Sequence, residues 1–189
     1  MKEKAKKNIK IAVISAIALV LVGAIVLTVV LCFSGDLSKK VEKSLKSAQT
    51  AAISVAVKDG ETYVYGLEKS ISFIDGGANV TTTTKKLNQN SFGLKEETIS
   101  EFVESATAKD SLSLDLSKEM FSSKDKSGKE TTVVVSKANA NAFFGVTDAK
   151  ANTDVNVKFV FEKNKLTSIS IAYSLVSGKT VEMTATYTY

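Results

Sequence analysis

The sequence predicts an α+β protein: a curled antiparallel β-sheet (a half-barrel) with an N-terminal and a mid-chain helix, preceded by one transmembrane helix. Three patterns predict this. An uncharged apolar run covers Ile11–Phe33. Apolar residues recur at helical spacing after Asp36 and again in Gly93–Ala108, and they alternate with polar residues over most of the remaining chain. The predicted divisions are a cytoplasmic basic tail at 1–10, a transmembrane signal anchor at 11–33 and an extracytoplasmic α+β domain at 36–189.

The apolar run is long enough to cross a bilayer. Its 23 residues would extend about 35 Å as a helix, against a hydrocarbon core of about 30 Å. A cleaved secretory signal has a shorter apolar region, about 7–15 residues, followed by a small-residue cleavage site. An uncleaved signal anchor is therefore favoured over a cleaved signal. Leu31 stands where a lipobox needs a small residue, so Cys32 is interpreted as an apolar helix residue and not a lipidated one.

Lysines flank both ends of this predicted span. Five precede it and four follow it closely, so the positive-inside rule favours a cytoplasmic N-terminus by a small margin. The β-rich, Ser/Thr-rich remainder favours the same orientation. The prediction is a single-pass cell-membrane protein with its domain outside, and a cytoplasm-facing domain is the alternative. All 25 basic residues are lysines, a usage that hints at a low-GC bacterial genome.

The first helix of the domain is predicted to follow Asp36, a residue type that caps helix N-termini. Apolar residues recur at helical spacing from there, at Leu37, Val41, Leu45, Ala48 and Ala52. The lysines that follow the span lie on the opposite side of this helix. They are expected either to contact anionic lipid headgroups or to form an ordinary solvated face: Lys39, Lys40, Lys43 and Lys46.

From Ile53 the apolar period changes to two, which predicts strands joined by tight turns at Asp59-Gly60 and Asp75-Gly76-Gly77. The β-branched run Thr81–Thr84 suits an exposed or edge strand. The predicted strands are Ile53–Val57, Thr62–Leu67, Ile71–Ile74 and Asn79–Lys85. A second helix is predicted over Gly93–Ala108, with its glutamates along one exposed face and therefore unsuited to surround a metal ion.

The second half of the chain predicts further strands and a closing antiparallel meander with one apolar face. Between its strands we expect a helical turn at Ser117–Phe121, a polar turn at Ser122–Lys129 and a tight turn at Ala138–Gly145 that carries two phenylalanines inward. The predicted strands are Ser111–Leu116, Thr131–Ser136, Val155–Phe161, Ile169–Leu175 and Val181–Tyr189.

Eight or nine strands spaced about 4.8 Å apart make a sheet roughly 40 Å wide, of which two helices about 10 Å across cover only about half. A curled sheet with an apolar concave side accounts for the rest. The order of elements resembles the LolA/LppX-like half-barrel of envelope lipoproteins and lipid carriers. The resemblance rests on Leu112–Leu116 with the following Ser-Lys-Glu-Met-Phe, Val133–Val135, Ala138–Gly145 and the Lys165–Tyr189 hairpin. It implies an extracytoplasmic location and, in some members, a lipid in the concavity.

Large apolar side chains of the second half are the candidate lining of such a concavity, and a packed core is the favoured alternative. They are Phe143, Phe144, Phe159, Phe161, Ile171 and Tyr173. The expected function is a non-catalytic binding or structural domain held at the membrane. The two alternatives are a lipid or acyl-chain carrier and a cytoplasm-facing membrane adaptor.

Catalysis is not expected from this composition. The chain has no histidine, and its single thiol, Cys32, lies within the predicted span, which removes the usual general base and nucleophile. Neither G-x-S-x-G nor a P-loop motif occurs. No cofactor or metal site is expected. The domain after residue 10 is nearly neutral, with 20 lysines against 19 acids, so it offers no basic surface for nucleic acid.

Overall fold

The computed structural model describes residues 36–87, 93–104, 121–144 and 151–189, with the backbone alone for Asp36 and for 141–144. These residues form two helices and nine strands. The elements are α2 (Asp36–Lys46), β1 (Thr50–Asp59), β2 (Thr62–Ile74), β3 (Gly77–Leu87), β4 (Leu94–Glu104), β5 (Phe121–Ser127), β6 (Glu130–Val135), α4 (Lys137–Phe144), β7 (Val155–Glu162), β8 (Lys165–Ser174) and β9 (Thr180–Thr188).

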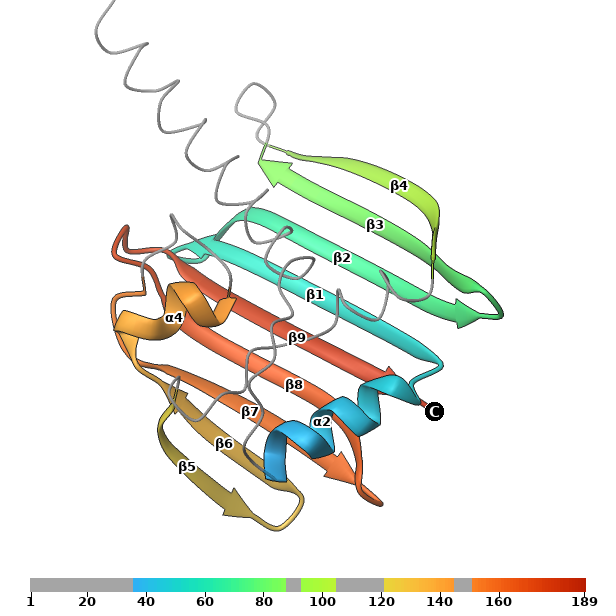
Figure 1. Cartoon of the computed structure of the whole chain (residues 1–189). Coiled ribbons are helices and arrows are strands. Elements are labelled where there is room, and N and C mark those ends of the chain that lie inside the picture. The colour runs from blue at the N-terminus through green and yellow to red at the C-terminus, as the bar shows by residue number, and fades with distance from the viewer. Residues whose placement is uncertain (1–35, 88–92, 105–120, 145–150) are drawn as a thin grey trace, which may run out of the picture.

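The strands form one open, curled antiparallel sheet in the order β4-β3-β2-β1-β9-β8-β7-β6-β5 (Figure 1). Two meanders, β1–β4 and β5–β9, meet where the first strand pairs with the last, from Thr50↔Thr188 to Lys58↔Thr180. This long-range pairing places β4 at one edge of the sheet and β5 at the other. Both helices lie over the same face of the sheet (Figure 1).

The two faces of the sheet differ in chemistry, as the alternating pattern predicts. The inner face, toward the helices, is buried and apolar; β1 contributes Ile53, Val55 and Val57 to it, each less than 5% exposed. The outer face carries the intervening residues, which are mostly serines, threonines and charged side chains. Shielding apolar residues on one face while hydrating the other is the usual arrangement of an antiparallel sheet.

Helix α2 is held on β8 by its apolar stripe and by one serine. Leu37, Val41 and Leu45 are buried, which confirms the predicted stripe, although the helix ends at Lys46 and Ala52 belongs to β1. Ser44 is buried between helix and sheet. Its hydroxyl donates to the Lys40 carbonyl at 2.8 Å and accepts the Leu166 N–H at 3.1 Å.

The carbonyl of the same Leu166 accepts a hydrogen bond from the Tyr189 hydroxyl at 2.6 Å. Both backbone groups of this buried residue are thus paired by side chains, as buried backbone requires. Lysines cover the two rings nearby: the Lys40 ammonium lies 4.0 Å from the centre of the Phe161 ring, and that of Lys165 lies 4.4 Å from the Tyr189 ring. We call Ser44, Leu166 and Tyr189 the α2 latch.

The predicted helix over Gly93–Ala108 is wrong, because residues 94–104 form strand β4. Eleven consecutive residues of β4 pair with β3 without interruption, from Gly77↔Glu104 to Leu87↔Leu94. The segment contains Thr98, Ile99, Phe102 and Val103, and side chains of these types favour strands. The pairing also makes β3 an internal strand, so Thr81–Thr84 is half-exposed but not at an edge.

Three smaller predictions also change. Most of the expected turn Ser122–Lys129 is strand β5, with only its end forming a turn. The expected turn Ala138–Gly145 is the helix α4, which begins where the Asp154 carboxylate accepts the Lys137 N–H at 2.9 Å. The strands expected at Thr62–Leu67 and Ile71–Ile74 are one continuous strand, β2.

The basic tail at 1–10, the predicted span Ile11–Phe33 and the predicted strand Ser111–Leu116 lie outside the described residues. Within the described part of the chain, neither helix is long and apolar enough to cross a bilayer.

Candidate functional site

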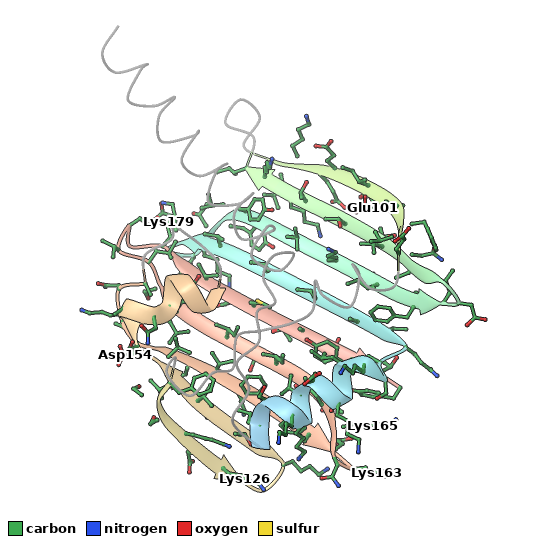
Figure 2. All side chains as sticks on the ribbon, in the orientation of Figure 1. Glu101, Lys126, Asp154, Lys163, Lys165 and Lys179 are labelled. Carbon is green, nitrogen blue, oxygen red and sulfur yellow. The ribbon has the colours of Figure 1, made fainter. Side chains whose placement is uncertain are left out.

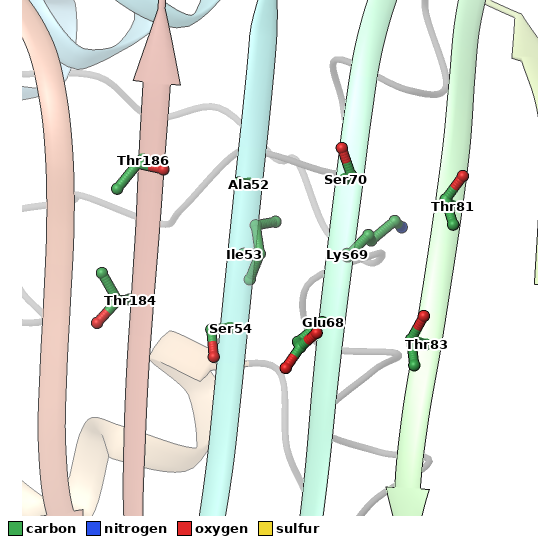
Figure 3. A pocket seen from close by; sticks show the side chains of 10 residues that line it. All are labelled: Ala52, Ile53, Ser54, Glu68, Lys69, Ser70, Thr81, Thr83, Thr184 and Thr186. Atoms are coloured by element: carbon green, nitrogen blue, oxygen red, sulfur yellow. The ribbon is translucent and has the colours of Figure 1, made fainter. Parts of the chain in front are cut away.

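A hollow of about 480 Å³ opens on the outer face of the sheet, on the side away from the helices. Four neighbouring strands, β9, β1, β2 and β3, line it (Figure 3). We call it the outer hollow; its lining residues are Ala52, Ile53, Ser54, Glu68, Lys69, Ser70, Thr81, Thr83, Thr184 and Thr186.

The pairing of these strands aligns the lining residues in two cross-strand rows. The first row is Thr184–Ser54–Glu68–Thr83 and the second is Thr186–Ala52–Ser70–Thr81. The short side chains in the middle of the second row leave space between flanking threonines, which explains the depression. Outside the hollow, β8 and β4 extend the two rows with further hydroxyls, so that six adjacent strands contribute.

The hydroxyls at the β3–β4 end of the rows bond to one another. Thr81 Oγ1 lies 3.1 Å from Ser100 Oγ, and Thr83 Oγ1 lies 2.9 Å from Thr98 Oγ1. A hydroxyl has one donor hydrogen and two acceptor lone pairs, so each retains hydrogen-bonding capacity after such a contact. The rows therefore present a dense set of groups that can both donate and accept.

Two ion pairs neutralise outer-face charges at the hollow and near it. The Lys85 ammonium lies 2.8 Å from the Glu68 carboxylate, and the hydrogen bond that it donates to this carboxylate raises the pKa of Lys85. Farther along the same face, Lys58 forms an ion pair with Glu182 at 2.8 Å. The face thus has little net field, and recognition there depends on hydrogen bonds rather than charge.

The hydroxyls of the hollow can bind a ligand by donating and accepting hydrogen bonds. Glu68, the carboxylate in the hollow, is engaged by Lys85, and activating a serine needs an adjacent free base. Among the residues that the structure describes, no three or more acidic or cysteine side chains gather where they could hold a metal ion.

Four of the six residues predicted to line a concavity lie on the opposite, inner face. Phe159, Phe161, Ile171 and Tyr173 are all buried on the adjacent strands β7 and β8. Burial raises the pKa of Tyr173 to about 12. The structure brings these four side chains to one face, whereas the side chains of Phe143 and Phe144, in α4, lie outside the described residues.

The four lysines predicted to contact headgroups are divided by their exposure. Lys40 is half-buried over Phe161. The other three are exposed on the side of α2 away from the sheet, and we call them the α2 lysine face: Lys39, Lys43 and Lys46.

Sequence reasoning missed the outer hollow, and it also missed Lys69. Lys69 pairs with Ile53 and Thr82 and follows the alternation of Leu67 and Ile71, so it occupies a position in the apolar inner row of β2. Burial lowers the pKa of this lysine, and the charge of Glu101 opposes the shift. The visible signal was the polar interruption Glu68-Lys69-Ser70 between two apolar segments.

No family model and no curated protein matches the chain. Solved structures with some similarity include a redesigned β-barrel, with 7% sequence identity over 79% of this chain and 96% of that one and a TM-score of 0.26. A bifunctional dehydratase-cyclase domain in ambruticin biosynthesis shows 10% identity over 80% of each chain, with a TM-score of 0.26. An N-terminal dehydratase from the difficidin assembly line shows 10% identity over 81% and 82%, with a TM-score of 0.18. These likenesses carry no argument about activity.

The coarse part of the LolA/LppX-like resemblance holds, since the described residues form an open, curled antiparallel sheet with two helices on one face. Its details do not support membership of that family. Leu112–Leu116 lies outside the described residues, and Ala138–Gly145 is helical up to Phe144 instead of forming a tight turn.

Proposed function

We propose that this chain is a single-pass, membrane-anchored protein of the bacterial envelope whose outer domain binds a hydroxylated, saccharide-type ligand without catalysis. The observation that carries the proposal is the outer hollow, where two aligned rows of hydroxyls flank a depression on the exposed face. The opposite face is the buried core of the domain.

The chemistry of the hollow favours a neutral polyhydroxyl compound over an ion. A sugar presents hydroxyls that donate and accept, and serine and threonine side chains match both roles. Glu68 and Lys85 at the hollow, and Lys58 and Glu182 nearby, already form ion pairs, so an ion binding to these side chains would have to compete with them. Because the hollow is shallow and open, we expect it to hold part of an extended polymer with modest affinity.

The test uses the full chain in neutral maltoside micelles and measures its retention on insoluble bacterial cell-wall polysaccharide. The Ser70→Phe variant fills the hollow and should reduce retention at least tenfold. The matched control is Ser174→Phe, which adds the same ring to the outer face of β8, away from the lining. Failure of the unaltered chain to be retained, or equal retention of the two variants, would refute saccharide binding.

The membrane placement rests on the predicted span, the flanking lysines and the position of α2. Only two residues separate the predicted end of the span from the start of helix α2, so its lysine face would lie close to the headgroups. Protease treatment of intact cells tests the orientation. Loss of the domain before lysis supports an outside location, and survival until lysis supports the cytoplasm-facing adaptor.

A lipid or acyl-chain carrier is the second candidate, and Lys69 is the observation that favours it. A half-buried ammonium in an otherwise apolar row could pair with the carboxylate of a fatty acid whose chain lies on the inner face. Native mass spectrometry of the full chain released from micelles separates the candidates. Co-purified fatty acid that disappears in Lys69→Met would support the carrier, and a ligand-free spectrum after incubation with oleate would exclude it.

A further inference from the structure

Strand β4 forms an unusually long and regular sheet edge. It runs for 11 residues, and its register with β3 is continuous, with no bulge. In such a strand the backbone N–H and C=O groups of alternate residues point away from the partner, and they can pair with a further strand. Figure 1 shows β4 at the end of the sheet, next to β3.

The opposite edge is shorter and less regular than β4. Strand β5 has only 7 residues, and its pairing with β6 contains a register shift between Phe121 and Ser123. Its sequence, FSSKDKS, places charged side chains in a row. Short length, bulges and charges, lysine above all, keep edge strands from pairing with other chains. Lys126 on this edge and Glu101 on β4 are labelled at opposite ends of the sheet in Figure 2.

Large apolar side chains are exposed on β4. Leu94, Ile99 and Phe102 are 47%, 58% and 59% exposed, respectively. Phe102 packs across Gly77, where a Cβ atom would lie 2.2 Å from its ring, whereas the described residues leave more than half of Ile99 open. An added strand would cover Ile99 and gain the free energy of burying it.

The negative charge of β4 favours a basic strand as its partner. One lysine and four glutamates give the strand a net charge of −3, and none of the ion pairs among the described residues involves these glutamates. On the inner face the order is Glu97, Ile99, Glu101, so a partner with lysine, an aliphatic residue and lysine at alternate positions matches it. Cross-strand pairs of opposite charge stabilise a sheet, and like charges directly opposite destabilise it.

A second copy of β4 is a poor match for the same reason. Antiparallel pairing centred on Ile99 would put Glu97 opposite Glu101 twice, and parallel in-register pairing would put every glutamate beside its equivalent. We therefore propose that β4 is a docking edge for an extended, basic polypeptide segment of another protein, which adds to the sheet as a tenth strand through the pattern Lys-x-aliphatic-x-Lys. This site is independent of the outer hollow.

The experiment uses the full chain in neutral maltoside micelles and a capped fluorescent peptide, TVTKTVTKTVT, with anisotropy as the readout. We expect the acidic counterpart, TVTETVTETVT, to bind at least tenfold more weakly. A peptide methylated at alternate backbone nitrogens keeps its charge but cannot pair as a strand, and it should lose binding by a similar factor. If the methylated and unmethylated basic peptides bind equally well, non-specific charge attraction explains the binding and the proposal is overturned.

Charge reversal supplies a second, independent readout. The Glu97→Lys/Glu101→Lys variant should lose the basic peptide and gain the acidic one. The control, Glu61→Lys/Asp125→Lys, changes net charge equally at exposed positions away from β4 and should leave the preference unchanged. Circular dichroism checks that both variants fold. The proposal fails if the unaltered chain binds neither peptide, if both variants behave alike, or if light scattering shows that the chain dimerises through β4 instead.

Discussion

Replacing Ser44 with alanine should loosen α2 from the sheet. The Ser44 hydroxyl accepts the Leu166 N–H at 3.1 Å and donates to the Lys40 carbonyl at 2.8 Å. Alanine removes the acceptor without offering another, and the apolar surroundings keep Leu166 fully buried. Leaving a buried donor unsatisfied costs about 1–3 kcal/mol. We expect the free energy of unfolding to fall by about 2 kcal/mol.

Ser47→Ala is the matched control, in the turn directly after α2. Ser47 is exposed and its hydroxyl contacts only carbonyls of α2 itself, those of Lys43 and Ser44. Removing it should change the free energy of unfolding by no more than about 0.5 kcal/mol. Urea titration of the full chain in micelles, followed by circular dichroism, gives both values, and hydrogen exchange at the Leu166 amide reports the latch locally. Equal stabilities of the two variants, with unchanged exchange at Leu166, would refute the role assigned to Ser44.

Three further predictions concern packing, alkaline stability and the membrane. Gly77→Ala should lower the free energy of unfolding by about 1–3 kcal/mol in urea titration, because the new Cβ would lie 2.6 Å from the Val103 carbonyl oxygen. Gly66→Ala should lower it less, since the Tyr63 side chain obstructs the new Cβ there and can move more easily than backbone. A larger loss for Gly66→Ala than for Gly77→Ala would contradict this packing. Burial raises the pKa of Tyr65 and that of Tyr173 to about 12. The folded state therefore keeps these two hydroxyl protons to a higher pH than the unfolded state does. The stability they contribute is complete below pH 10 and is lost as the pH rises from about 10 to 12, by roughly 2–3 kcal/mol for each group; urea midpoints that stay constant over this range would contradict it. Replacing the three lysines of the α2 lysine face with glutamine should weaken binding of α2 to anionic vesicles. Hydrogen exchange of the α2 amides, measured on the full chain with vesicles present, should then be faster than in the unaltered chain. Unchanged exchange would favour an ordinary solvated face.

Local sequence patterns were sufficient where the period was unambiguous. The meander β7–β9 and strand β1 alternate between apolar and polar residues, and their inner residues are buried as predicted, except Met183, which is partly buried. The local pattern did not decide the secondary structure of the segment 94–104. Ile99, Phe102 and Val103 suit a helical stripe as well as a strand, and the pairing partner decides between them. That partner is β3, whose hydroxyl-rich surface forms cross-strand hydrogen bonds with Thr98 and Ser100.

The outer hollow could not be predicted, because it depends on three strand registers at once. Ser54 meets Thr184 only through the pairing of β1 with β9, across more than a hundred residues of chain. It meets Glu68 through β2, and Glu68 meets Thr83 through β3. A shift by one residue in any pairing would move a strand's apolar residues to the outer face. The alternation of serines and threonines was visible in the sequence, but their alignment into rows is a property of the folded sheet.

The arrangement of the elements separates helix α2 from the two proposed binding surfaces. Helix α2 lies over β8, and the latch ties it to Leu166 at the start of that strand. From β8 the sheet continues through β9, β1, β2 and β3 to β4, five strand spacings, or about 24 Å. The outer hollow occupies the middle of this path and the β4 edge its far end. With α2 at the headgroups, as proposed above, the docking edge lies away from the membrane, where a partner strand can reach it. Loosening the latch by Ser44→Ala should therefore leave binding of the basic peptide to β4 intact in micelles, as measured by anisotropy.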